Sequence, residues 1–223
     1  MKKQKELSPG GEISTTELYS KLEKYRVVPV IAIENIESAL PLADALIEGG
    51  LPVAEITFRT EAATGVISKL KAERPQLLVG AGTVLTLNNL KKSIECGAEF
   101  AVAPGFNMEI VRHSRKMGFP FSPGIMTPSD IEGALGLGVK ILKFFPAEAA
   151  GGIKFLKSIA APYSHTGVRF IPTGGINQNN LADYLAFPSV LAVGGTWIAK
   201  KDDIAAGNWN KIKENCLQIS SLL

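Results

Sequence analysis

Short apolar runs rich in β-branched residues alternate along the chain with amphipathic stretches. Eight such runs start roughly 19 to 29 residues apart, and most end near Gly, Pro or Thr. They span residues 27–33, 53–58, 77–82, 100–103, 120–122, 139–145, 168–173 and 190–193. Because parallel strands need a crossover of about a dozen residues or more, usually a helix, this spacing indicates βα units. Eight units predict an α/β fold, a (β/α)8 TIM barrel.

The region before the first run predicts one extra helix. Residues 1–13 are polar and contain Pro9-Gly10-Gly11, so we expect a flexible N-terminal arm. The segment Ser14-Thr15-Thr16-Glu17 has the form of a capping box, and Leu18 and Leu22 follow at helical spacing. We therefore expect a helix over residues 14–25 and a single barrel domain over 14–223.

A doubly wound open sheet is the alternative architecture. That fold places a GxGxxG segment after its first strand, and this chain has none there. Its glycine pairs instead follow the seventh and eighth runs, where barrels often bind phosphate.

Composition excludes several classes of protein. The chain has 223 residues, 46% of them hydrophobic, which is enough for one sizeable core, but no apolar run approaches the ~20 residues of a membrane span. The net charge is only +3, without a basic block, so we expect no nucleic-acid partner. Two distant cysteines and no secretory segment indicate the cytoplasm. Two histidines in no ligand spacing predict no metal site.

The sixth run, residues 139–145, carries the most specific chemistry. Lys143 shares a face with Val139, Ile141 and Phe145, so we expect its amine to be buried inside the barrel. Burial favours the neutral amine, which is the form that Schiff-base chemistry on a carbonyl needs. The alternative is that an inward carboxylate such as that of Glu55 pairs with the lysine. Lys140 has the opposite orientation and is interpreted as a solvated or helix-packing lysine.

The second run places polar side chains on one face. Val53, Glu55, Thr57 and Arg59 alternate with Ala54, Ile56 and Phe58, and the apolar set suits the helix-covered outside of a barrel. Glu55 and Arg59 are therefore expected to point inward near the carboxyl mouth, where barrel enzymes hold their active sites. The alternative is that they pair with each other or with mouth loops.

Two glycine pairs, Gly174-Gly175 and Gly194-Gly195, follow the last two runs and precede helical stretches. Glycines allow close backbone approach, and N–H groups at a helix start attract anions. We expect a substrate phosphate near Gly174, Gly175, Gly195 and the hydroxyl of Thr196. Thr83 and Pro104 end the third and fourth runs. The Thr83 hydroxyl could bind a polar substrate group, but each feature alone is interpreted as turn chemistry.

Taken together, six segments resemble the 2-keto-3-deoxy-6-phosphogluconate (KDPG) and 4-hydroxy-2-oxoglutarate (KHG) aldolase family from about residue 15 to the C-terminus. The segments are EITFRT at 55–60, GAGTV at 80–84, PG at 104–105, KFFPAE at 143–148, PTGGI at 172–176 and GGTW at 194–197.

The resemblance implies a metal-free and cofactor-free class I aldolase, a carbon–carbon lyase of the Entner–Doudoroff pathway that assembles as a homotrimer. It implies that Lys143 is the Schiff-base lysine and Glu55 the general base. The matching positions around the pyruvyl part of the substrate are Arg59, Thr83, Pro104, Phe145 and Thr173; those at the phosphate end are Gly174, Gly175, Gly195 and Thr196. Thr196 departs from the serine of better-known members, which bears on the preference between phosphorylated and unphosphorylated substrates.

The expected substrate is a small keto-acid phosphate. We expect cleavage of KDPG to pyruvate and glyceraldehyde 3-phosphate, and also of 4-hydroxy-2-oxoglutarate to pyruvate and glyoxylate. Two alternatives remain: a phosphosugar epimerase or isomerase, which would need paired acid and base groups or a metal, and a non-catalytic phosphosugar-binding barrel, which would need no buried lysine.

Overall fold

The computed structural model describes residues 15–222. The expected arm, residues 1–13, and the expected helix start at Ser14 lie outside them. The helices are α1 (Thr15–Tyr25), α2 (Ala39–Glu48), α3 (Ala63–Glu73), α4 (Leu87–Glu95), α5 (Met108–Lys116), α6 (Pro128–Gly136), α7 (Gly152–Ala160), α8 (Leu181–Leu185), α9 (Lys201–Ala205) and α10 (Trp209–Ser220). The strands are β1 (Val27–Ile31), β2 (Val53–Thr57), β3 (Leu78–Gly82), β4 (Phe100–Val102), β5 (Phe121–Ser122), β6 (Gly124–Ile125), β7 (Ile141–Phe144), β8 (Arg169–Pro172) and β9 (Val193–Gly195).

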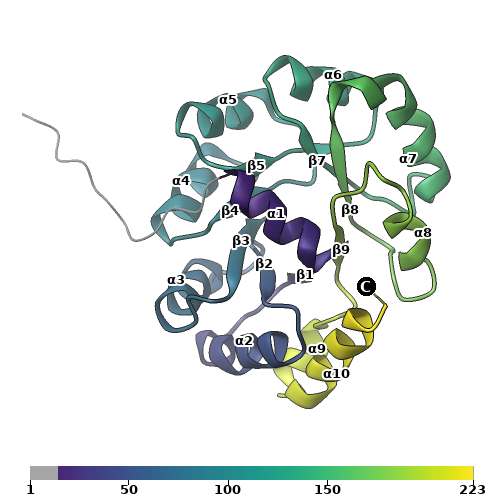
Figure 1. Cartoon of the computed structure of the whole chain (residues 1–223). Coiled ribbons are helices and arrows are strands. Elements are labelled where there is room, and N and C mark those ends of the chain that lie inside the picture. The colour runs from purple at the N-terminus through teal and green to yellow at the C-terminus, as the bar shows by residue number, and fades with distance from the viewer. Residues whose placement is uncertain (1–14, 223) are drawn as a thin grey trace, which may run out of the picture.

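The strands form a ring of parallel neighbours surrounded by helices (Figure 1). Pairing runs in the order β5-β4-β3-β2-β1-β9 and, separately, β6-β7-β8. Isolated parallel bridges from Phe170 to Val190 and from Thr173 to Gly194 join the β8 region to that of β9. Since β5 and β6 flank Pro123 as one interrupted strand, the ring has eight positions, and the predicted (β/α)8 barrel is confirmed.

The structure differs from the predicted runs in three places. Pro123 splits the fifth position into β5 and β6, because proline has no N–H for the ladder. The last strand begins at Val193, and Val190 forms only an isolated bridge. The sixth strand begins at Ile141, and Val139 in the preceding turn packs with the outer layer, so its expected place on the inward face was wrong.

Two apolar clusters follow from strand alternation. The outer cluster lies between strands and helices and includes Ala54, Ile56, Leu142 and Phe144. The inner cluster fills the barrel. Most of its members alternate with these along the strands: Val28, Val53, Leu78, Phe100, Val102, Ile141 and Ile171; Leu191 and Ala192, directly before β9, also belong to it.

Helix α1 closes the amino end of the barrel. It crosses the ring in Figure 1, and its Leu18 and Leu22 belong to the inner cluster. Each of these leucines is almost fully buried, and the burial of each one stabilises the fold by roughly 1.5–3 kcal/mol. The open end of the barrel is therefore the carboxyl end, where the strands deliver their last side chains.

No helix within residues 15–222 combines the length and the apolar character that crossing a bilayer requires.

Candidate active site

Lys143 lies inside the barrel on β7. Its neighbours Leu142 and Phe144 point into the outer cluster, whereas Ile141 points into the inner one, so alternation directs Lys143 inward. The residue is only 6% exposed, which confirms the predicted burial. Its Nζ also lies 5.9 Å from the ring centre of Phe145.

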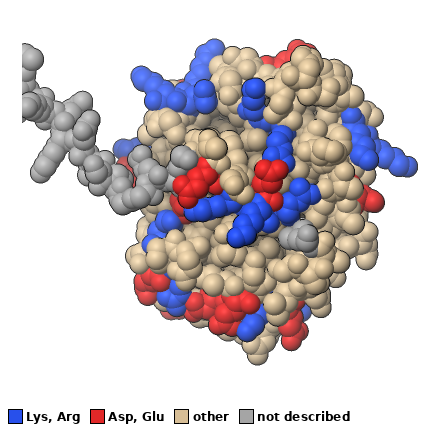
Figure 2. All heavy atoms as spheres, viewed as in Figure 1, with Lys and Arg blue, Asp and Glu red and all other residues tan. Residues whose placement is uncertain are grey.

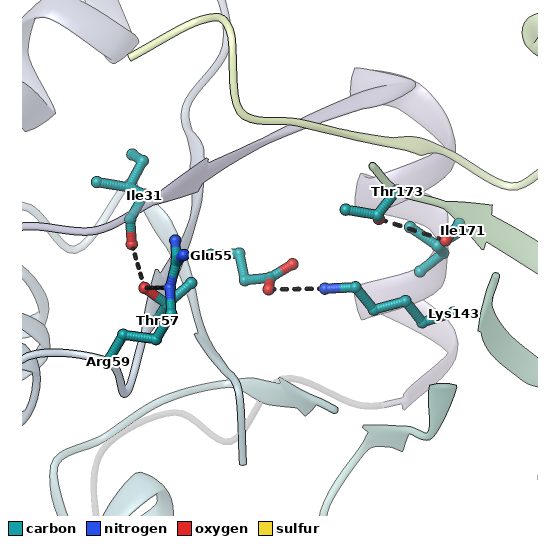
Figure 3. Close-up of polar contacts among 7 residues, drawn as sticks. All are labelled: Ile31, Glu55, Thr57, Arg59, Lys143, Ile171 and Thr173. Carbon is teal, nitrogen blue, oxygen red and sulfur yellow. Dashed lines mark hydrogen bonds and ion pairs between the residues drawn. The ribbon is translucent and has the colours of Figure 1, made fainter. Parts of the chain in front are cut away.

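Glu55 faces Lys143 from the opposite wall. On β2, Val53 belongs to the inner cluster while Ala54 and Ile56 belong to the outer one, as the alternating pattern predicts. The Glu55 side chain is 3% exposed, and its Oε1 lies 3.0 Å from Lys143 Nζ (Figure 3). The alternative in which an inward carboxylate pairs with the lysine is therefore the arrangement seen.

This pair is a buried contact between an amine and a carboxylate. Lys143 Nζ donates a hydrogen bond to Glu55 Oε1 at 3.0 Å. At this distance a proton can pass directly between the two groups.

Arg59 lies two residues after the end of β2, and its side chain is exposed at the carboxyl end of the barrel. Its Nε donates a hydrogen bond to Thr57 Oγ1 at 3.2 Å, and that hydroxyl donates to the carbonyl of Ile31 at 3.0 Å. Figure 3 shows these groups on the side of Glu55 away from Lys143. Within residues 15–222 Arg59 forms no ion pair, so the alternative of a Glu55–Arg59 pair is not seen.

Three further predicted positions surround the mouth. Thr83 directly follows β3 and has a φ of 59°, a conformation uncommon for a residue with a branched side chain. Thr173 directly follows β8 and is 2% exposed, with its Oγ1 3.5 Å from the carbonyl of Ile171. Pro104 follows β4 and is half-buried.

The two glycine pairs lie side by side, since Thr173 and Gly194 form a parallel bridge. Gly174 and Gly175 have φ angles of 103° and 79°, which other residues rarely adopt. Gly195 is buried at the end of β9, and Thr196 is exposed directly after it.

The helices that follow these glycines start too late in the chain for their first N–H groups to lie at the glycine pairs. Helix α8 begins at Leu181 and α9 at Lys201, and each has only five residues. The expected helix-terminus contribution at Gly175 and Thr196 is therefore wrong, and only backbone approach and the hydroxyl remain as reasons for an anion there.

Glu148 and Tyr184 are functional candidates that sequence reasoning missed. The Glu148 N–H donates to the carbonyl of Gly174 at 3.0 Å, and the Tyr184 hydroxyl donates to the Glu148 carboxylate. Burial, together with this acidic partner, raises the pKa of Tyr184, so the hydroxyl stays protonated and keeps donating. Glu148 closes the KFFPAE segment, which was the available signal; nothing in the sequence pointed to Tyr184.

A buried lysine in contact with a carboxylate, at the carboxyl mouth of a parallel barrel, defines a barrel enzyme with an amine nucleophile. Comparison with known proteins agrees. A family model described as KDPG and KHG aldolase matches residues 18–215.

Similar proteins and solved structures are also named KDPG or KHG/KDPG aldolases. The 2-dehydro-3-deoxy-phosphogluconate aldolase of Haemophilus influenzae is 46% identical over 199 residues, which cover 89% of this chain and 93% of that one. The KHG/KDPG aldolase of Escherichia coli is 45% identical over 186 residues, covering 83% and 86%. A crystal structure of KDPG aldolase from Legionella pneumophila, with pyruvate captured at low pH as a covalent carbinolamine intermediate, has a TM-score of 0.86 and 41% identity, covering 90% of this chain and 97% of that one.

The chain belongs to the KDPG and KHG aldolase family, and it is an aldolase, a carbon–carbon lyase. The epimerase, isomerase and binding-protein alternatives are not favoured.

Proposed function

We propose that this protein is a class I aldolase that cleaves KDPG to pyruvate and glyceraldehyde 3-phosphate, a step of the Entner–Doudoroff pathway. The observation that carries the proposal is the 3.0 Å contact between Lys143 Nζ and Glu55 Oε1 inside the barrel. The names of the relatives support KDPG as substrate, and those of the Escherichia coli relative support KHG as a second one, giving pyruvate and glyoxylate.

Covalent attachment begins with proton transfer from Lys143 to Glu55. The neutral amine adds to the C2 ketone and forms an N–C bond, giving a carbinolamine. Glu55, now a carboxylic acid, returns a proton to the departing hydroxyl, which leaves as water, and an iminium ion forms. The carbinolamine captured in the Legionella pneumophila enzyme supports amine addition to a ketone at this kind of site.

Carbon–carbon cleavage uses the same carboxylate. Glu55 accepts the proton of the C4 hydroxyl, the C3–C4 bond breaks, and its electron pair moves into the iminium to give an enamine. The aldehyde product leaves. Glu55 gives the proton that it accepted to C3 of the enamine, and water hydrolyses the resulting iminium to release pyruvate and the free lysine.

Binding groups surround this pair at both ends of the substrate. Arg59, a planar guanidinium at the mouth, is proposed to hold the substrate carboxylate. We assign the pyruvyl part to Thr83, Pro104, Phe145 and Thr173, and the phosphate to Gly174, Gly175, Gly195 and Thr196.

Assembly, compartment and domain limits are also proposals. We propose a cytoplasmic homotrimer, as the family resemblance implies, with residues 14–223 as its single domain and 1–13 as an arm.

Borohydride trapping tests the mechanism. Incubation of the full chain with pyruvate and sodium borohydride should add a reduced pyruvyl group to Lys143, detected by peptide mass spectrometry. Lys143→Met should show no adduct and no turnover, whereas Lys140→Met, at a lysine that directly precedes β7 and lies outside the site, should retain both. Active protein without an adduct on Lys143 overturns the imine mechanism.

A further inference from the structure

A cavity lies at the amino end of the barrel, opposite the Lys143–Glu55 pair. It has a volume of about 450 Å3 and is bounded by α1, the end of α5, and the segments that lead into β5, β7 and β8. None of the residues assigned above to catalysis or substrate binding lines it. It is therefore a separate place for a ligand, of a size typical for small-molecule sites.

Two cations line this cavity, Arg115 from α5 and Lys140 from the segment before β7. A Cβ built on Gly138 would lie 3.3 Å from Arg115 Nη2, and one on Gly167 would lie 3.7 Å from Lys140 Nζ. Each cation thus lies close to a glycine, where a larger residue would place a side chain against it.

Among residues 15–222, the lining of this cavity carries only positive charge, because no Asp or Glu belongs to it. Within the same residues neither Arg115 nor Lys140 has an ion pair or a side-chain hydrogen bond. Figure 2 shows Lys and Arg side chains on this face of the molecule, which α1 crosses, with some Asp and Glu side chains among them. Guanidinium and ammonium groups left without carboxylates suit an anion with several oxygens, such as phosphate.

Three aromatic residues also line the cavity. Tyr19 and Phe119 are half-buried, and Phe121 is buried. Burial raises the pKa of Tyr19, and the charge of Arg115 lowers it by a smaller amount. The guanidinium therefore lies near that ring. Aromatic surface beside two cations favours a ligand that combines a flat ring with phosphate groups.

We propose that this cavity binds a phosphorylated small molecule that carries a flat ring, of the nucleoside diphosphate class. The phosphates contact Arg115 and Lys140, and the ring packs against Tyr19 and Phe119. This site neither uses nor requires the Lys143–Glu55 chemistry.

Isothermal titration calorimetry of the full chain with ADP tests the proposal. The double variant Arg115→Gln/Lys140→Gln should weaken ADP binding on the order of tenfold or more, because it removes both charge-assisted contacts. The matched control is the double variant Arg112→Gln/Lys116→Gln together with the single variant Lys116→Gln: the double removes two positive charges from α5 and the single removes one, all outside the cavity lining. Lys143→Met should bind ADP as the unmodified chain does.

Further titrants separate the ring from the phosphates. Pyrophosphate and ribose 5-phosphate should each bind more weakly than ADP, and Tyr19→Ala should reduce the difference. Equal binding of ADP by Arg115→Gln/Lys140→Gln and by Arg112→Gln/Lys116→Gln overturns the site, as does no detectable binding of ADP. Equal affinity for pyrophosphate and ADP overturns the role of the ring.

Discussion

Gly82 lies directly against the carboxylate of Glu55. The two residues occupy neighbouring strands, and a Cβ at position 82 would be 2.3 Å from Glu55 Oε1, the atom that contacts Lys143. A glycine at the end of β3 therefore gives the Glu55 carboxylate the space to reach across the barrel.

Gly82→Ala is expected to displace this carboxylate and lower kcat by on the order of tenfold or more, since small misplacements of reacting groups are costly. Steady-state kinetics on the folded variant measures the loss. Gly136→Ala is the control, because a Cβ there meets nothing within 4 Å. Full activity of Gly82→Ala would show that Glu55 need not stay where it is.

Glu55→Gln removes the proton acceptor while preserving the shape of the side chain. We expect kcat to fall by about 10²- to 10⁴-fold, the usual range for a general base, and borohydride trapping with pyruvate to slow as well. Glu214→Gln on α10 is the matched exposed control. Trapping at the unmodified rate would mean that another group takes the lysine proton.

Tyr184→Phe tests the support beneath the glycine loop. It removes the hydroxyl that donates to Glu148, whose N–H holds the carbonyl of Gly174. If this loop binds phosphate, KM for KDPG should rise several-fold, as expected for one hydrogen bond, while KM for unphosphorylated 4-hydroxy-2-oxoglutarate stays constant. The same change with both substrates would contradict a role in phosphate binding.

Leu22→Ala tests the closure of the barrel by α1. Truncation of this buried leucine should lower the free energy of unfolding by about 2–5 kcal/mol, measured by urea denaturation. The activity of the folded enzyme should be unchanged, because α1 covers the end opposite Lys143. Leu217→Ala, at a side chain that is 47% exposed, should cost far less; equal losses would contradict the closure.

The two cysteines should be unreactive in the native protein. Burial raises the pKa of Cys96 to about 11 and that of Cys216 to about 12, so the thiolate is scarce at neutral pH. Iodoacetamide should label both slowly at pH 8 and rapidly in urea. Because unfolded thiols ionise near their ordinary value of 9.0 while folded ones stay protonated, this effect makes the free energy of unfolding fall as pH rises above about 9. Rapid labelling of native protein would contradict the burial.

Strand alternation made much of the fold and the site predictable. The inward set on β2 and the inward position of Lys143 depend on a period of two, which a single sequence displays. The same logic failed at Val139, because the residue precedes the strand and has no pleat to follow.

Contacts across the barrel were harder to predict from the sequence. The alternation placed Glu55 and Lys143 on inward faces, but their 3.0 Å contact depends on barrel diameter and on the space at Gly82. Tyr184 and Glu148 are 36 residues apart and meet only through the packing of α8. The cavity beside Arg115 and Lys140 likewise arises from four segments, far apart in the sequence, that come together only in the folded chain.

The pairing of β1 with β9 has a consequence for biosynthesis. Val27 is matched with Val193, so the ring cannot close until the ribosome has delivered nearly the whole chain. Until then the apolar face of α1 has no enclosed interior to cover. Leu18 and Leu22 are therefore expected to stay uncovered in the nascent chain until β9 has been made, and truncated products that end before β9 are expected to be aggregation-prone.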